Sequence, residues 1–191
     1  MRLFQLCALL ILPWLAACSG GESNKDPVAE AKFQNEKRIG DEAVTEKQER
    51  DAEFMVTAAS SSMTNLEISQ IAQRKATSPD VKYLAQMIVG EHGNMQADLK
   101  SLAQKKSIVL PTNLGENQAK IVGELTALNG AGFDRKYLDL LEDIHKNSVD
   151  EFDDLSEDAY DGDIRAFAAK YLPTLKKHRE AAEQAADKLP K

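Results

Sequence analysis

The chain contains three histidines, and each lies in a different stretch of helical hydrophobic periodicity. His92, His145 and His178 each have apolar residues about one turn before and after them, so each imidazole lies on an apolar helix face. The flanking residues are Ile88 and Met95, Leu141 and Val149, and Leu175 and Ala182. A buried imidazole can bind a transition metal or join a buried hydrogen-bond network. The three histidines are therefore the first candidates for a functional site.

Two glutamates could complete such a site. Glu67 lies on an i, i+4 row of apolar positions in a fourth helical stretch, so we expect its side chain to point inward. Glu142 stands three residues before His145, in the Glu-x-x-His spacing of ferritin-like di-iron bundles. The other two histidines have no carboxylate three residues before them. Glu91 adjoins His92 but is turned about 100° away from it around the helix.

Three imidazoles with one or two carboxylates favour a single transition-metal ion, Zn, Cu, Mn or Fe(II), over a carboxylate-bridged pair. The same groups could instead form a buried hydrogen-bond network that fixes the register of the helices. Both alternatives require the groups to be close, because an unpaired buried polar group costs roughly 1 to 3 kcal/mol. Separations of about 3 to 4 Å between imidazole nitrogens would fit one ion, whereas hydrogen bonds among them would favour the network.

Four long helical segments must position these groups. Apolar residues recur with helical spacing over about residues 45–76, 79–106 and 133–160, and again after a break at Asp161-Gly162-Asp163. A shorter helix over residues 118–128 separates the second long segment from the third. No segment alternates with period two over the length of a strand. The prediction is an all-α fold, a four-helix bundle with a short crossover helix between the second and third long helices.

A secretion signal precedes the helices. Residues 1–17 begin with the positive charge of Arg2 and continue as an apolar stretch that is short for a membrane span. The stretch ends in Leu15-Ala16-Ala17-Cys18, which resembles the bacterial lipobox, so we expect a signal peptide over residues 1–17 and lipid attachment at Cys18. Because Ser19 and not aspartate follows the cysteine, we expect a lipid anchor in the outer membrane, with the protein facing the periplasm.

The rest of the chain divides into a tether and a domain. Residues 18–50 are polar and are expected to form a flexible tether behind the lipidated cysteine, while residues 51–189 are long enough to bury a core. The formal net charge of -7 argues against nucleic-acid binding and against broad attraction to anionic lipid, so acyl chains would supply the membrane attachment. Processing would remove Cys7 and use Cys18, which leaves no disulfide and no thiol nucleophile.

Several motifs along the chain resemble the bacterial DUF4142 family. They are Asn65-Leu66-Glu67-Ile68, Ser78-Pro79-Asp80-Val81 ahead of Glu91-His92, Phe133-Asp134-Arg135-Lys136-Tyr137 ahead of His145, and Phe167-Ala168 with Leu172-Pro173 ahead of His178. The resemblance covers about Asp51 to Leu189 and implies a predicted outer-membrane protein with a ferritin-like bundle. The family's biochemical role is undefined, so the resemblance supports fold and location and does not imply a mechanism.

Three functions remain open. The chain shows no nucleophile beside a base, no glycine-rich phosphate loop and no complete di-metal set, so we expect a non-enzymatic envelope lipoprotein that binds a ligand, metal or partner, with a role in stress tolerance as one option. The first alternative is a metal-dependent oxidase or peroxide-consuming enzyme; its residues would be Glu67, His92, Glu142, His145 and His178. The second alternative is a purely structural protein that binds another envelope protein. The sequence does not identify that protein partner.

Overall fold

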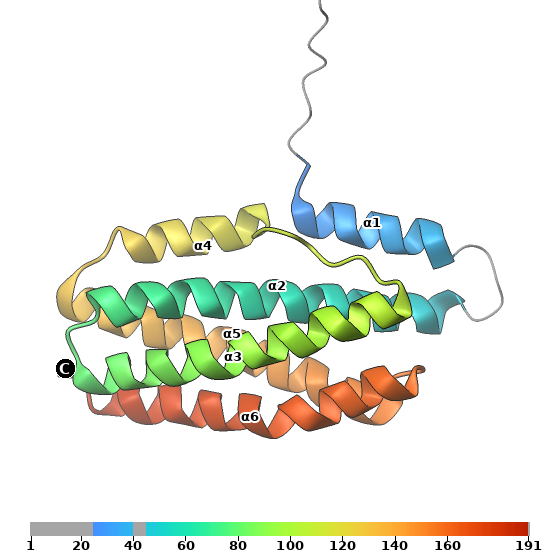
Figure 1. The fold of residues 1–191 in the computed structure, drawn as a ribbon. Helices are drawn as coiled ribbons and strands as arrows, with labels where there is room; N and C mark the ends of the chain where they lie inside the picture. Colours follow the sequence, from blue (N-terminus) through green and yellow to red (C-terminus); the bar gives the residue numbers. More distant parts are fainter. Residues whose placement is uncertain (1–24, 40–44, 191) are drawn as a thin grey trace, which may run out of the picture.

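Four long helices pack side by side in the computed structural model, and two shorter helices lie against one side of them (Figure 1). The structure describes residues 25–39 and 45–190. These residues form six helices and no strand, which confirms the all-α prediction; the likeness to ferritin stays a prediction. The long helices are α2 (Thr45–Lys75), α3 (Pro79–Lys106), α5 (Gly130–Asp158) and α6 (Gly162–Asp187), and the shorter ones are α1 (Pro27–Ile39) and α4 (Glu116–Thr126).

Contacts at the two ends of the long helices give their directions. The start of α3 meets the start of α5, where Asp134 accepts hydrogen bonds from the backbone N–H groups of Thr77 and Ser78. The end of α3 meets the start of α6, where Lys106 pairs with Asp161 at 2.5 Å. Short turns join α2 to α3 and α5 to α6, so α3 and α5 run parallel and each is antiparallel to the helix joined to it. The chain between α3 and α5 returns along the bundle through α4, which contacts α2 (Figure 1).

The core consists of two apolar clusters with a polar layer between them. One cluster lies toward the start of α6 and contains Phe54 and Phe152, whose ring centroids are 4.9 Å apart. The other lies toward the start of α5 and contains Phe133 and Tyr137. Between the clusters every long helix buries polar residues, among them Ser62 and Asn65 on α2, His92 on α3, His145 and Ser148 on α5, and His178 on α6. The middles of the four long helices therefore lie at one level along the bundle.

Helix α1 lies within the segment that was expected to be a flexible tether over residues 18–50, so the structure corrects that expectation. Asp26 accepts hydrogen bonds from N–H groups of the first turn, and Pro27 occupies a position where no amide hydrogen is needed. Asn35 binds the helix to the segment between α3 and α4. Its Nδ2 donates to the carbonyl of Val109, and its Oδ1 accepts from the N–H of Val109.

The signal peptide predicted over residues 1–17 and the lipidation site at Cys18 lie outside the described residues, and both stay predictions. Within residues 25–39 and 45–190, none of the helices has the length and apolar character that crossing a membrane requires.

The Asp134→Ala substitution is expected to lower the free energy of unfolding by about 2 kcal/mol, because hydrogen bonds to a buried carboxylate are lost and their donors stay partly buried. The Asp134 side chain accepts from the N–H of Ser78 at 2.8 Å and from the Thr77 hydroxyl at 2.6 Å. Urea denaturation measures the effect. Asp143→Ala, at an exposed position of α5, is the control. Equal stability of the two variants would show that water replaces the carboxylate at the turn.

Candidate metal centre

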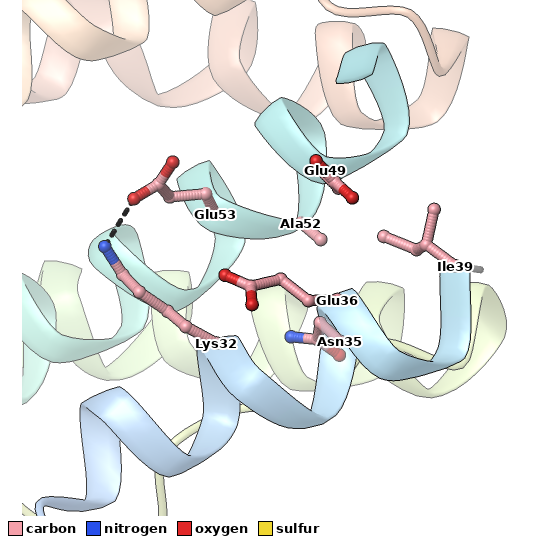
Figure 2. Close-up of a pocket in the computed structure, with 7 residues that line it drawn as sticks. All are labelled: Lys32, Asn35, Glu36, Ile39, Glu49, Ala52 and Glu53. Carbon is pink, nitrogen blue, oxygen red and sulfur yellow. Dashed lines mark hydrogen bonds and ion pairs between the residues drawn. The ribbon is translucent and has the colours of Figure 1, made fainter. Parts of the chain in front are cut away.

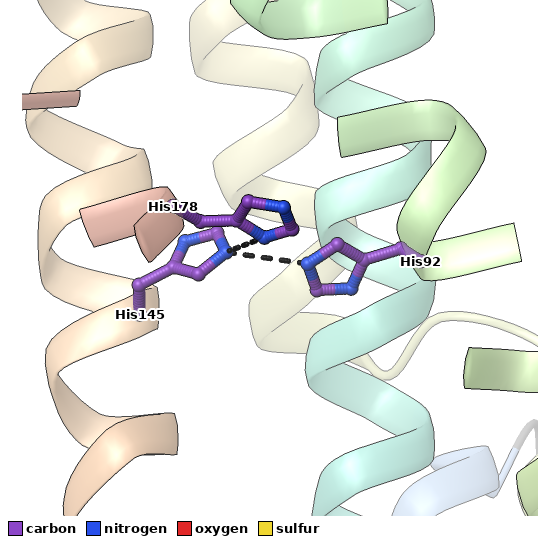
Figure 3. Close-up of side chains that lie close together, drawn as sticks. All are labelled: His92, His145 and His178. Carbon is purple, nitrogen blue, oxygen red and sulfur yellow. Dashed lines mark hydrogen bonds between the residues drawn. The ribbon is translucent and has the colours of Figure 1, made fainter. Parts of the chain in front are cut away.

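Three imidazoles from α3, α5 and α6 meet in the polar layer of the core (Figure 3). Nε2 of His92 lies 3.2 Å from Nε2 of His145, which in turn lies 3.3 Å from Nδ1 of His178. One nitrogen of each ring lies within 4.8 Å of the corresponding nitrogen of the other two. The residues are at most 1% exposed. The structure thus brings the three histidines to one level, as their spacing predicted.

The nitrogens that face away from the cluster are held by other groups. Nδ1 of His145 lies 2.8 Å from the carbonyl oxygen of Leu141, one turn earlier on α5. Nε2 of His178 lies 2.5 Å from a carboxylate oxygen of Glu91. Nδ1 of His92 lies 3.2 Å from the hydroxyl of Ser62 on α2. Such partners fix the orientation of an imidazole and the nitrogen that carries its proton.

These outer partners determine where the lone pairs are. A carbonyl oxygen can only accept, so Nδ1 of His145 carries the proton and its Nε2 presents a lone pair to the cluster. The carboxylate of Glu91 likewise accepts from Nε2 of His178, which leaves a lone pair on Nδ1 of the neutral ring. Two lone pairs therefore face each other at 3.3 Å.

Burial keeps the three rings neutral. It lowers the pKa of His145 to about 3 and the pKa of His92 well below its usual range, and the neighbouring imidazoles add to both shifts. Burial also lowers the pKa of His178, although the hydrogen bond that its Nε2 donates to Glu91 opposes that shift. Near pH 7, therefore, neither His145 nor His178 carries a proton on the nitrogen that faces the other ring. The neutral ring of His92 can donate at most one proton to the cluster.

A count of protons thus separates the two alternatives that the sequence left open. The distances of 3.2 and 3.3 Å alone fit both a hydrogen-bond network and two ligands of a tetrahedral ion, which lie about 3.3 Å apart when bonds are about 2.0 to 2.1 Å. Hydrogen bonds among three neutral rings leave at least one inward lone pair unpaired. A cation would satisfy all three lone pairs, so the arrangement favours a metal ion.

Two of the five predicted site residues do not join the cluster. Glu67 is exposed, so the expectation that it points inward is wrong. Glu67 lies two residues after Asn65, about 200° around α2, so it faces away from the histidine layer, although Ile71 on the same i, i+4 row is buried. The core face of α2 passes instead through Ser62 and Asn65. Glu142, about 60° around α5 from His145, is only half-buried and is not part of the group that could hold an ion.

Sequence reasoning missed three residues of this layer, namely Ser62, Asn65 and Glu91. Glu91 was set aside because it points away from His92 on its own helix, but that direction takes it to His178 on α6. The signal for the other two was a run of small polar residues, Ser60 to Asn65 with one methionine, in the middle of an otherwise apolar helix face.

A second candidate is a small pocket between α1 and α2 (Figure 2). Its lining residues are Lys32, Asn35, Glu36, Ile39, Glu49, Ala52 and Glu53. Lys32 already pairs with Glu53 at 2.5 Å, and both are partly exposed. Burial and the charge of Glu53 raise the pKa of nearby Glu151 to about 7, against the opposing effect of Lys32. The lysine of this pocket is partly exposed and already paired, so the histidine cluster remains the stronger candidate.

A family model described as a domain of unknown function, DUF4142, matches residues 37–185, a span that contains the three histidines and nearly all of the four long helices. No curated protein and no solved structure matches the chain.

Proposed function

Because the chain belongs to the DUF4142 family, a domain of unknown function, we propose a function from its own geometry. The bundle binds a single transition-metal ion through His92, His145 and His178. One observation carries the proposal: in two of these rings the outer nitrogen is held as a donor, to Leu141 and to Glu91, so lone pairs converge in the buried core. Three imidazoles without a carboxylate in the cluster favour Zn, Cu or Fe(II) over Mn.

Metal analysis tests this proposal. The full chain, purified without a histidine tag and stripped with a chelator, is supplied with Zn, Cu, Fe(II) or Mn in separate samples and then desalted. We expect one ion per chain for at least one of the first three metals. Well below one tenth of an ion per chain for all four metals would overturn the proposal, because a preformed set of three imidazoles should retain a borderline metal through desalting.

The carboxylate of Glu91 is expected to strengthen metal binding by orienting His178. Glu91→Gln keeps the size of the side chain and weakens the acceptor, so we expect metal affinity to fall by about 10-fold, as for other residues that support a ligand. Competition with a chromophoric chelator measures the change. Asp98→Asn is the matched control, since it removes an exposed carboxylate from α3 that pairs with Lys170. Equal affinities for the two variants would contradict this role of Glu91.

The proposal includes a location, which is supported by the sequence of the N-terminus. Lipid on Cys18 anchors the chain in the outer membrane, and the metal-binding bundle faces the periplasm. The mass of the mature protein tests this directly. We expect loss of residues 1–17, addition of acyl chains to the cysteine, and neither change in a Cys18→Ser variant. A mature protein that retains residues 1–17 or carries no lipid would refute the anchor.

A further inference from the structure

Asn65 is a buried amide without a partner. The residue is 0% exposed, and neither Nδ2 nor Oδ1 of its side chain makes a hydrogen bond within the part of the chain that the structure describes. An amide in a protein core normally has both atoms paired, because desolvation without a partner is costly. A fully buried amide with two unpaired atoms therefore indicates a ligand or water molecule that pairs with it.

The position of Asn65 relates it to the histidine cluster. It lies about one turn along α2 from Ser62, whose hydroxyl contacts His92, and one turn from Ser69, whose hydroxyl pairs with Tyr137 at 2.9 Å. Asn65 therefore lies between these two contacts on the core face of α2. Helices α2 and α5 run in opposite directions, so the step from Ser69 back to Asn65 on α2 points the same way along the bundle as the step from Tyr137 forward to His145 on α5. His145 lies two turns beyond Tyr137, so Asn65 lies next to the level at which the three imidazoles meet.

We propose that Asn65 binds a small oxygen ligand, water or hydroxide, at the open position of the metal ion, and that small anions can replace this ligand. The inference rests on the metal site proposed above. Three imidazoles leave one position of a tetrahedral ion free. A bound water can accept from Nδ2 and donate to Oδ1 of one amide, which pairs both orphaned atoms. The site is then an exchangeable metal centre and not a closed structural one.

Direct binding of Asn65 to the ion explains the two unpaired atoms less well than binding to a ligand on the ion. An amide oxygen is a hard ligand that suits Mg, Ca or Mn, whereas three imidazoles suit softer ions. A bond from Oδ1 to the ion would also leave Nδ2 unpaired in the core. Hydrogen bonding to a ligand on the ion pairs both atoms, so we place Asn65 beside the ion and not on it.

Azide binding to the cobalt(II)-loaded chain tests the proposal, because the visible spectrum of cobalt reports both the number of ligands and the arrival of an anion. The test variant is Asn65→Leu, which has the same number and branching of side-chain heavy atoms and no hydrogen-bonding group. We expect its cobalt affinity to stay within about 3-fold of wild type and its azide affinity to fall by about 10-fold, the loss of one hydrogen bond to a charged group. Ser69→Ala, one turn away and paired with Tyr137, is the control and should change neither affinity.

The other outcomes are distinct. Wild-type protein that binds cobalt but no azide, or an Asn65→Leu variant that binds azide as wild type does, overturns the role of Asn65 and leaves the metal site intact. A loss of cobalt affinity of 100-fold in Asn65→Leu would make Asn65 a direct ligand and also overturns the proposal. Absence of cobalt binding in wild type would refute the metal site itself. Asn65→Thr gives a second variant if Asn65→Leu does not fold.

Discussion

Replacing His145 with alanine is expected to weaken metal binding by about 100-fold or more. His145 is the central ring of the cluster, because its Nε2 lies 3.2 Å from His92 and 3.3 Å from His178. Structural zinc sites with four ligands are worth roughly 10 to 16 kcal/mol, so one ligand contributes about 3 kcal/mol or about 100-fold in affinity. Competition against a chelator of known affinity measures the loss.

The control for this variant must remove core volume without removing a nitrogen. Val149→Ala does so one turn further along the same face of α5, at a residue that is 8% exposed. We expect it to reduce stability but to leave metal affinity within about 3-fold, since the three rings remain in place. If His145→Ala bound metal as tightly as Val149→Ala, the imidazole cluster would not be the binding site.

Acid is expected to destabilise the metal-free protein between about pH 6.5 and pH 3. The pKa of His145 is about 3 in the folded chain, whereas an unfolded histidine titrates near 6.5. Between these values the unfolded chain binds more protons, so the free energy of unfolding falls as the pH falls and is highest above about 6.5. The slope for this residue is about 1.4 kcal/mol per pH unit. Urea denaturation at several pH values measures it.

The contribution of His145 can be isolated by comparison with His145→Gln, which cannot take up a proton. Glu151 has the opposite effect, because its pKa of about 7 makes the folded chain bind more protons than the unfolded chain at mildly acidic pH. Glu151 is present in both proteins, so the difference between them cancels its effect. We expect wild type to lose stability on acidification faster than His145→Gln. Parallel curves would mean that His145 is not held neutral in the core.

The four long helices could be predicted from the sequence because each carries its own hydrophobic periodicity, although α5 begins at Gly130, three residues before its predicted start. Helix α3 begins as predicted, with Ser78 as its cap and Pro79 as its first residue. Helix α1 was missed although Asp26 and Pro27 form a similar start signal, since only Ala31 among its apolar residues is fully buried and its attachment to Val109 comes from a distant segment.

The histidine cluster could be predicted because one imidazole occurs near the middle of three helices. Its remaining members could not be, for a physical reason. Periodicity tells which residues share a face of one helix, whereas the pairing of Glu91 with His178 and of Ser62 with His92 depends on the relative rotation of two helices. Glu67 shows the same limit, because it is exposed although Ile71, one step further on the same i, i+4 row of α2, is buried.

X-ray absorption of the zinc-loaded full chain tests the central claim most directly. It measures the type, number and distance of the atoms around the ion without depending on a variant. The account predicts three imidazole nitrogens at about 2.0 to 2.1 Å, with one oxygen ligand in the fourth position. A zinc ion with one imidazole or none, surrounded by carboxylate and water oxygens, would contradict it.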